Sequence, residues 1–89
     1  MEEVEILVQR GRGLVELKRY PAAIAELKKA LSVEPEHFLA LVLLCGCYID
    51  TKDKKPALGY AQKLVSTYPS EDIAHYYLAL AWDMNSEPV

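Results

Sequence analysis

The sequence predicts an all-α fold of about five antiparallel helices in a single small domain. Apolar residues recur at three- and four-residue spacing through most of the chain, which is the period of an amphipathic helix. The chain also resembles itself after a shift of 34 residues, which indicates repeated helix pairs. No segment alternates with the period of two that marks a β-strand, so we expect no sheet.

The repeat preserves the size of side chains as well as their polarity. The small residues are Gly11, Cys45 and Ala79, and the large ones three positions later are Leu14, Tyr48 and Trp82. The same shift joins Lys18 with Lys52 and Ala23 with Ala57. We therefore divide the chain, residues 1–89, into a repeat at 4–37, a second at 38–71 and a half repeat at 72–85.

Prolines and polar turns set the expected helix bounds. We expect a first helix from about Val4 to Leu17, and a second that has Pro21 in its opening turn and ends before Pro35. A third should run from roughly His37 to Asp50, a fourth should open at Pro56 and end before Tyr68-Pro69-Ser70, and a fifth should run from Ser70 to about Met84. Proline is tolerated in the first turn of a helix, where its missing N–H has no intrahelical partner to lose. Asp53 is the expected N-cap of the fourth helix, and Ser70 is expected at the start of the fifth.

A known family shares this pattern. Leu7-x-x-Arg10-Gly11-x-x-Leu14, followed by Ala23, Leu27, Ala30 and Pro35, resembles the tetratricopeptide signature W-x2-L-G-x2-Y…A-x3-F…P. The second copy reads Leu41-x-x-Leu44-Cys45-x-x-Tyr48, and the third has only its first helix, His75-x-x-Leu78-Ala79-x-x-Trp82. The resemblance implies a right-handed α-α superhelix, a tetratricopeptide-like solenoid, whose function is protein binding.

Two departures from the signature concern packing. Arg10 replaces an expected leucine near the N-terminus, where we expect solvent to reach it. In the second copy Ala61 stands in the place of Leu27, and Leu64 stands in the place of Ala30. The exchange nearly conserves volume, which is how cores tolerate change.

Composition excludes several classes of partner. The net charge is −3, and no basic face of the kind that nucleic-acid binders carry is evident. No apolar run approaches the roughly 20 residues that span a bilayer. The acidic start of the chain differs from the basic start of a secretion signal, so we expect a cytoplasmic protein without nucleic-acid or membrane partners.

No constellation of residues predicts catalysis. Cys45 and Cys47 are expected to be buried structural thiols, since two residues apart on a helix they point about 200° from each other. His37 is expected to be a solvated turn residue and His75 an amphipathic filler. Gly11 and Gly13 lie inside a helix, where they would permit close helix approach. We therefore expect no enzyme, no cofactor and no metal site.

The resemblance places the first helix of each repeat on a concave face. Its expected peptide-binding residues are Val8, Arg12, Leu39, Val42, Gly46, Ile49, Ile73, Tyr76, Tyr77 and Leu80. Relatives that grip the acidic tail of heat-shock chaperones use a clamp of lysine, asparagine and arginine. The matching places here are mostly apolar, so we expect an apolar or amphipathic protein segment and no carboxylate-clamp partner. Small export chaperones of tetratricopeptide type are similar in size, which suggests a chaperone-like interaction role.

The fifth helix is apolar on nearly every side. Its Leu78 and Trp82 would be covered by a sixth helix in a complete repeat, so we expect self-association, such as a homodimer, through these residues. In the alternative, Trp82 folds back onto Ala61 and Leu64 and the chain stays monomeric. The second function hypothesis is accordingly structural: a self-associating unit, or part of a longer repeat array, without a peptide ligand.

Overall fold

The structure is a computed structural model, and it describes residues 2–86. That part of the chain forms α1 (Glu2–Glu16), α2 (Tyr20–Val33), α3 (Phe38–Asp50), α4 (Lys54–Thr67) and α5 (Asp72–Asn85). Within residues 2–86 there is no strand, so the predicted all-α class is confirmed.

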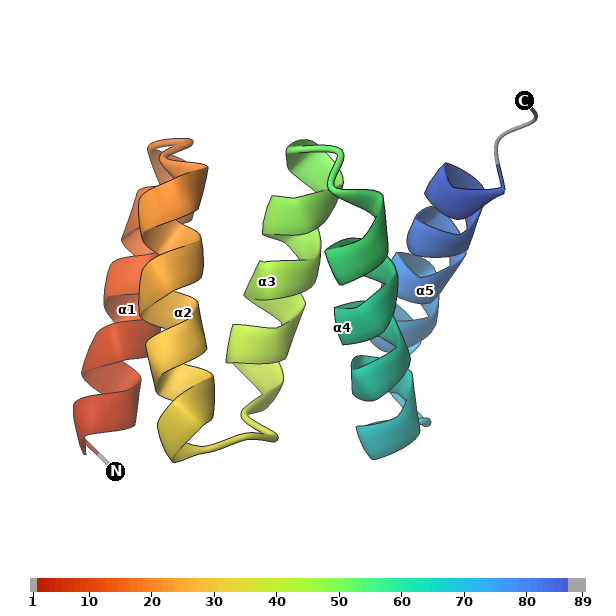
Figure 1. Cartoon of the computed structure of the whole chain (residues 1–89). Helices are drawn as coiled ribbons and strands as arrows, with labels where there is room; N and C mark the ends of the chain where they lie inside the picture. The colour runs from red at the N-terminus through yellow and green to blue at the C-terminus, as the bar shows by residue number, and fades with distance from the viewer. Residues whose placement is uncertain (1, 87–89) are drawn as a thin grey trace.

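The helices form two layers. Each helix packs on the next along the chain, and α3 also contacts α1 and α5. The odd-numbered helices therefore make one layer, and α2 and α4 make the other. Figure 1 shows the helices standing side by side in an elongated row, which measures 43 × 28 × 18 Å along its principal axes. This arrangement is that of two stacked helix pairs followed by a single helix.

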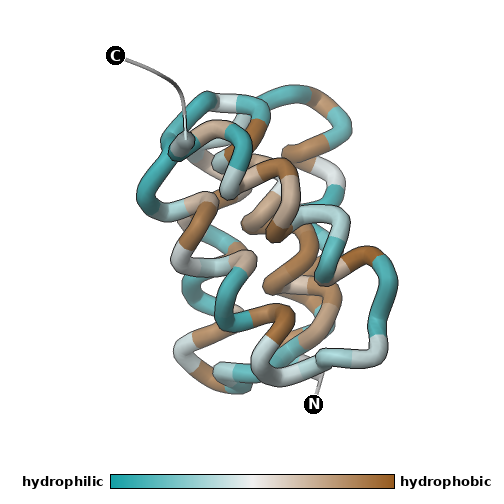
Figure 2. The backbone as a smooth tube through the Cα atoms, turned by 90° about the vertical axis from the view of Figure 1, so that its right-hand side faces the viewer, coloured by the Kyte–Doolittle hydropathy of each residue, from teal (hydrophilic) through white to brown (hydrophobic). Residues whose placement is uncertain are grey.

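The core follows the repeat. Leu27, Leu41, Leu44 and Leu64 are fully buried, and buried alanines on α2 and α4 let neighbouring helices approach closely. Both members of the exchanged pair, Leu27 with Ala30 and Ala61 with Leu64, have no exposed surface. In Figure 2 the hydrophobic stretches of the backbone lie mostly toward the middle of the molecule, and hydrophilic stretches make up much of its outside.

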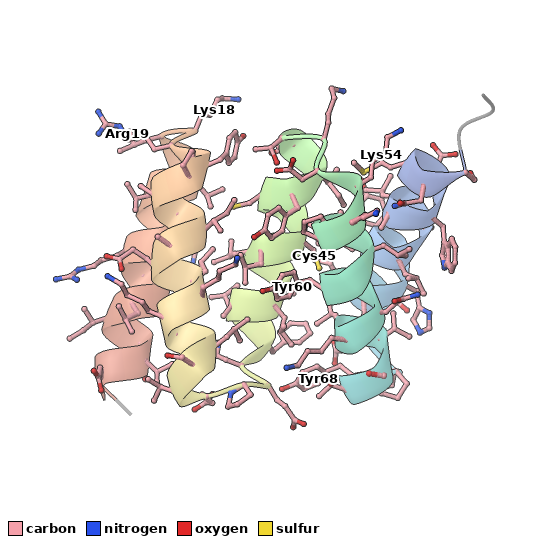
Figure 3. The ribbon with its side chains drawn as sticks, viewed as in Figure 1. Lys18, Arg19, Cys45, Lys54, Tyr60 and Tyr68 are labelled. Atoms are coloured by element: carbon pink, nitrogen blue, oxygen red, sulfur yellow. The ribbon has the colours of Figure 1, made fainter. Side chains whose placement is uncertain are left out.

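The two turns inside the repeats have the same backbone geometry. Lys18 and Lys52 have φ angles of 59° and 63°, the left-handed conformation that commonly ends a helix. The Arg19 N–H donates to Leu14 O at 2.8 Å, and the Asp53 N–H donates to Tyr48 O at 2.9 Å. These bonds satisfy carbonyls that the ends of α1 and α3 would leave without partners. Figure 3 shows Lys18 and Arg19 at the first of these turns.

Several helix starts differ from the expectations. α4 begins at Lys54, two residues before Pro56, whereas α2 begins at Tyr20 with Pro21 in its first turn, as expected. Asp53 occupies the N-cap position of α4, but its carboxylate accepts from the Thr51 hydroxyl at 2.8 Å and makes no cap bond to the backbone. The expected role of Ser70 is wrong, because Glu71 is the residue before α5.

His37 is the N-cap of α3, a role that its residue type does not predict. Its Nδ1 accepts from the Ala40 N–H at 3.2 Å, so the half-buried ring replaces the usual serine or aspartate. The expectation of a merely solvated turn residue was wrong.

Side-chain hydrogen bonds join successive repeats. The Tyr20 hydroxyl at the start of α2 donates to Asp50 Oδ2 at the end of α3, over 3.0 Å. The Asn85 amide at the end of α5 donates to Lys54 O at the start of α4, over 2.9 Å. Each even-numbered helix is therefore held at its start by the odd-numbered helix that follows it. At the other end of the molecule the Tyr68 hydroxyl donates to Glu36 O.

Candidate protein-interaction surface

The ten residues expected on the concave face lie on α1, α3 and α5, which form one layer. Arg12, Ile73 and Tyr76 are exposed; Leu39, Gly46, Ile49, Tyr77 and Leu80 are half-buried; Val8 and Val42 are buried. Seven of the eight accessible residues come from α3 and α5. We call these seven, Leu39, Gly46, Ile49, Ile73, Tyr76, Tyr77 and Leu80, the α3–α5 surface.

Val8 and Val42 belong to the core. They keep 2% and 7% of their surface exposed, so they offer almost no contact area to a ligand. Tyr76 follows Val42 by the same 34-residue step and is 59% exposed. Val8, Val42 and Tyr76 therefore occupy one repeat position on α1, α3 and α5. Tyr76 is exposed, unlike the two valines, because no helix within residues 2–86 covers α5 on that side.

Gly46 and Tyr77 lie close together across α3 and α5. A Cβ atom on Gly46 would lie 3.4 Å from the Tyr77 hydroxyl oxygen. The Tyr76 ring stands at 61° to the Tyr77 ring, with centroids 5.5 Å apart. Partial burial raises the pKa of Tyr77 above its ordinary value, so its hydroxyl stays protonated and can donate a hydrogen bond at neutral pH. Tyr76 and Tyr77 thus form a pair of aromatic side chains beside Gly46, which we call the aromatic ridge.

The α1 end of this layer is polar. Arg12 forms an exposed ion pair with Glu16, with its Nε 3.9 Å from a Glu16 oxygen, and Glu5 is also exposed. An open depression on α1 is lined by Glu5, Ile6, Gln9 and Arg10. Arg10 is exposed as expected and pairs with Glu26 of α2 at 3.5 Å. The layer thus has an apolar half on α3 and α5, and a half on α1 that carries charged side chains beside the exposed Ile6.

Comparison with protein families decides the classification. A family model described as tetratricopeptide repeat matches residues 14–82, which is well over half of the chain. The chain belongs to the tetratricopeptide repeat family. No curated protein and no solved structure matched it. Tetratricopeptide repeats are in general protein–protein interaction modules, and this coarse function applies to the chain.

The buried cysteines of this tetratricopeptide domain are not nucleophiles. Burial raises the pKa of Cys45 to about 12 and, together with the nearby Asp50 carboxylate, that of Cys47 to about 11. Both thiols are therefore protonated at neutral pH and inert. The expectation of buried structural thiols is confirmed, and Figure 3 shows Cys45 between α3 and α4.

The remaining polar candidates have structural contacts. His75 Nε2 donates to Pro69 O at 2.6 Å, across the start of α5. Among residues 2–86 no group of three or more His, Cys, Asp or Glu side chains could hold a metal ion. None of the helices in that part of the chain has the length and apolar character needed to cross a membrane.

Trp82 is half-exposed on α5. It keeps 51% of its surface accessible, while Leu78 on the same helix is half-buried. The alternative, in which Trp82 folds back onto Ala61 and Leu64 and the chain stays monomeric, stays a prediction.

Sequence reasoning missed the hydrogen bonds between repeats. Tyr20 and Lys54 occupy the same repeat position, but Tyr20 bonds through its side-chain hydroxyl and Lys54 through its backbone carbonyl. No shared residue type therefore predicts that both helix starts are hydrogen-bonded. The shared step of 34 residues could have drawn attention to that position, without identifying either partner.

Proposed function

We propose that the chain is a protein-interaction module that binds an apolar or amphipathic segment of a partner on its α3–α5 surface. One observation carries the proposal: Tyr76 and Ile73 are 59% and 37% exposed beside half-buried apolar residues. Large apolar side chains gathered at one place on a monomer are typical of an interaction site. The aromatic ridge supplies rigid contact area at low entropic cost.

The proposed ligand follows from the same surface. An amphipathic helix or an extended segment would place apolar side chains against Ile73, Tyr76 and Leu80. The Tyr77 hydroxyl would offer the partner a hydrogen-bond donor within this apolar area. We infer a cytoplasmic location, because the free thiols of Cys45 and Cys47 suit a reducing compartment. A chaperone-like role belongs to the same proposal, because an apolar surface of this kind can cover an apolar segment of a partner. The proposal includes no catalysis, no nucleic acid and no carboxylate-clamp ligand.

The direct test compares baits that differ in one surface charge. The parent chain, Tyr76→Glu and Gln62→Glu are immobilised, and proteins retained from a cell extract are compared by mass spectrometry. Gln62 is exposed on α4, so its variant carries the same added charge away from the proposed surface. We expect Tyr76→Glu to lose partners that the parent and Gln62→Glu retain. Equal retention by the three baits would refute this surface.

Self-association through Leu78 and Trp82 is the second candidate function. The half-exposed indole of Trp82 favours it, because burial of such a side chain is a common source of association energy. Sedimentation velocity over a dilution series tests it, together with the emission wavelength of this single tryptophan. A monomer at high micromolar concentration with water-like emission would refute it.

A further inference from the structure

One side of α5 corresponds to the side through which α1 and α3 pack on the helix that follows each of them. It carries His75, Leu78, Ala79 and Trp82, the equivalents of Leu7, Arg10, Gly11 and Leu14 and of Leu41, Leu44, Cys45 and Tyr48. The contacts of the first two copies define the role of this side. Gly11 lies against Leu27 of α2, and Tyr48 stacks on Tyr60 of α4 with centroids 5.6 Å apart.

The same positions are covered on α3 and open on α5. Leu41, Leu44 and Cys45 have no exposed surface, and Tyr48 keeps only 6%. On α5, His75 and Ala79 are exposed, Trp82 is 51% exposed and Leu78 is half-buried. We call the α5 residues His75, Leu78, Ala79 and Trp82 the open face. Its geometry is that of a helix-packing surface with no helix on it within residues 2–86.

A further stacked repeat does not suit α5. The first helix of such a repeat would pack against one set of repeat positions on α5. The equivalent positions are buried or half-buried on the earlier helices: Val4, Val8 and Val15 on α1, and Phe38, Val42 and Ile49 on α3. On α5 these positions are Asp72, Tyr76 and Asp83, and all three are exposed. Packing an apolar helix there would bury two carboxylates without partners, which is costly. The open face therefore suits one helix and not a continued array.

Charge indicates which kind of helix fits. α5 carries Asp72 and Asp83 and neither lysine nor arginine. The helices that cover the equivalent faces are basic: α4 has three lysines and no acid, and α2 has two lysines and one glutamate. A second copy of α5 would bring its own aspartates, so a two-fold pairing of α5 helices would place like charges near one another.

We propose that the open face binds a single basic amphipathic helix of another protein. Ala79 occupies the small-residue position of Gly11, so an apolar side chain of the bound helix can approach α5 closely there. Trp82 supplies the large apolar anchor, and Asp72 and Asp83 face lysines or arginines along one edge. This site is separate from the α3–α5 surface, so either can fail without the other.

A peptide copied from the chain itself is the probe. Residues 53–67 contain the three lysines of α4, and the peptide holds no tryptophan, so Trp82 emission reports only on the protein. In one experiment the fluorescein-labelled peptide is titrated with the full chain at low salt, and its fluorescence anisotropy is measured. In the other, the full chain is titrated with the unlabelled peptide, and the Trp82 emission wavelength of the protein is measured. The matched control peptide has its three lysines replaced by glutamate. We expect saturable binding, a blue shift of Trp82, and affinity about tenfold higher for the lysine peptide.

Protein variants locate the site. Trp82→Ala should weaken binding of the lysine peptide by at least about tenfold, as expected of a central apolar anchor. Replacing both Asp72 and Asp83 by lysine should reverse the preference between the two peptides, and Tyr76→Ala should leave it unchanged. The proposal is overturned if neither peptide binds, if both bind equally, or if Trp82→Ala binds like the parent. A blue shift of Trp82 on concentrating the chain alone, with dimers in sedimentation, would identify a second copy as the occupant instead.

Discussion

Gly11 of α1 lies directly against Leu27 of α2. A Cβ atom on Gly11 would lie 2.6 Å from Leu27 Cδ2 and 2.7 Å from its Cγ, which no packed core allows. The equivalent residues in the second repeat are Cys45 and Ala61, both fully buried. A larger residue on the first helix thus accompanies a smaller one on the second. In the first repeat the second helix fills the space between the helices with Leu27, and in the second repeat the first helix contributes the larger side chain, Cys45, opposite a smaller Ala61.

The first prediction tests this contact. Gly11→Ala should lower the free energy of unfolding by about 1–3 kcal/mol, because the fully buried Leu27 would have to shift to make room for the added Cβ atom. Gly13→Ala is the matched control in the same helix, since nothing lies within 4 Å of its Cβ position. It should stabilise the chain by up to about 1 kcal/mol through helix propensity alone. Urea titrations that gave the same sign for both variants would contradict the structure.

The second prediction concerns the left-handed lysines. Lys18→Gly and Lys52→Gly should each stabilise the chain by about 0.5 kcal/mol, because glycine adopts a positive φ without the steric cost of a Cβ atom. Part of that gain is offset by the greater freedom of glycine in the unfolded chain. Gln62→Gly, at an exposed position inside α4, should instead destabilise by roughly 1 kcal/mol. A lower melting temperature for both turn variants would show that these turns have another geometry.

The sequence predicted the fold because each repeat position keeps its size class. Gly11 and Cys45 stay small because a second helix passes close to that position in each complete repeat, and Ala79 keeps the same size class on α5. The two turns were equally readable, since prolines and polar residues interrupt the apolar period. Which segments form helices, and in which order, depends on such local patterns, so both could be predicted from this single sequence.

Burial within a repeat depends on which neighbours exist, and the sequence did not determine this. Val42 and Tyr76 occupy one repeat position, yet the first is in the core and the second is exposed. Gly13 was expected to permit close helix approach, as Gly11 does, but its Cβ position faces open space. The N-cap role of His37 was equally hidden, because histidine is not among the usual N-cap residues.

The third prediction concerns the thiols. Cys45 and Cys47 should react with a disulfide reagent at pH 8 only as fast as the chain opens, because both are fully buried and protonated. In guanidinium both should react at once. Fast labelling of either residue in the native chain would show that α3 is less protected than the structure has it.

The fourth prediction is the dependence of stability on alkaline pH. The pKa values of Cys45 and Cys47 rise on folding from the ordinary 9.0 to about 12 and about 11. Their contribution is therefore complete below pH 9 and is lost as the pH rises through 11 and 12. Replacing both cysteines by alanine should flatten the fall in unfolding free energy between pH 8 and pH 11. A smaller slope should remain, since burial also raises the pKa of Tyr77.

The last prediction uses one substitution at two equivalent positions. Val42→Glu should cost about 3 kcal/mol or more, because Val42 is 7% exposed and its core neighbours offer a carboxylate no partner. Tyr76→Glu should change stability by no more than about 0.5 kcal/mol, because Tyr76 is 59% exposed. Urea titrations of the two variants, followed by circular dichroism, measure both values. Similar costs would mean that something covers Tyr76 in solution, and sedimentation of the parent would then show whether that cover is a second copy of the chain.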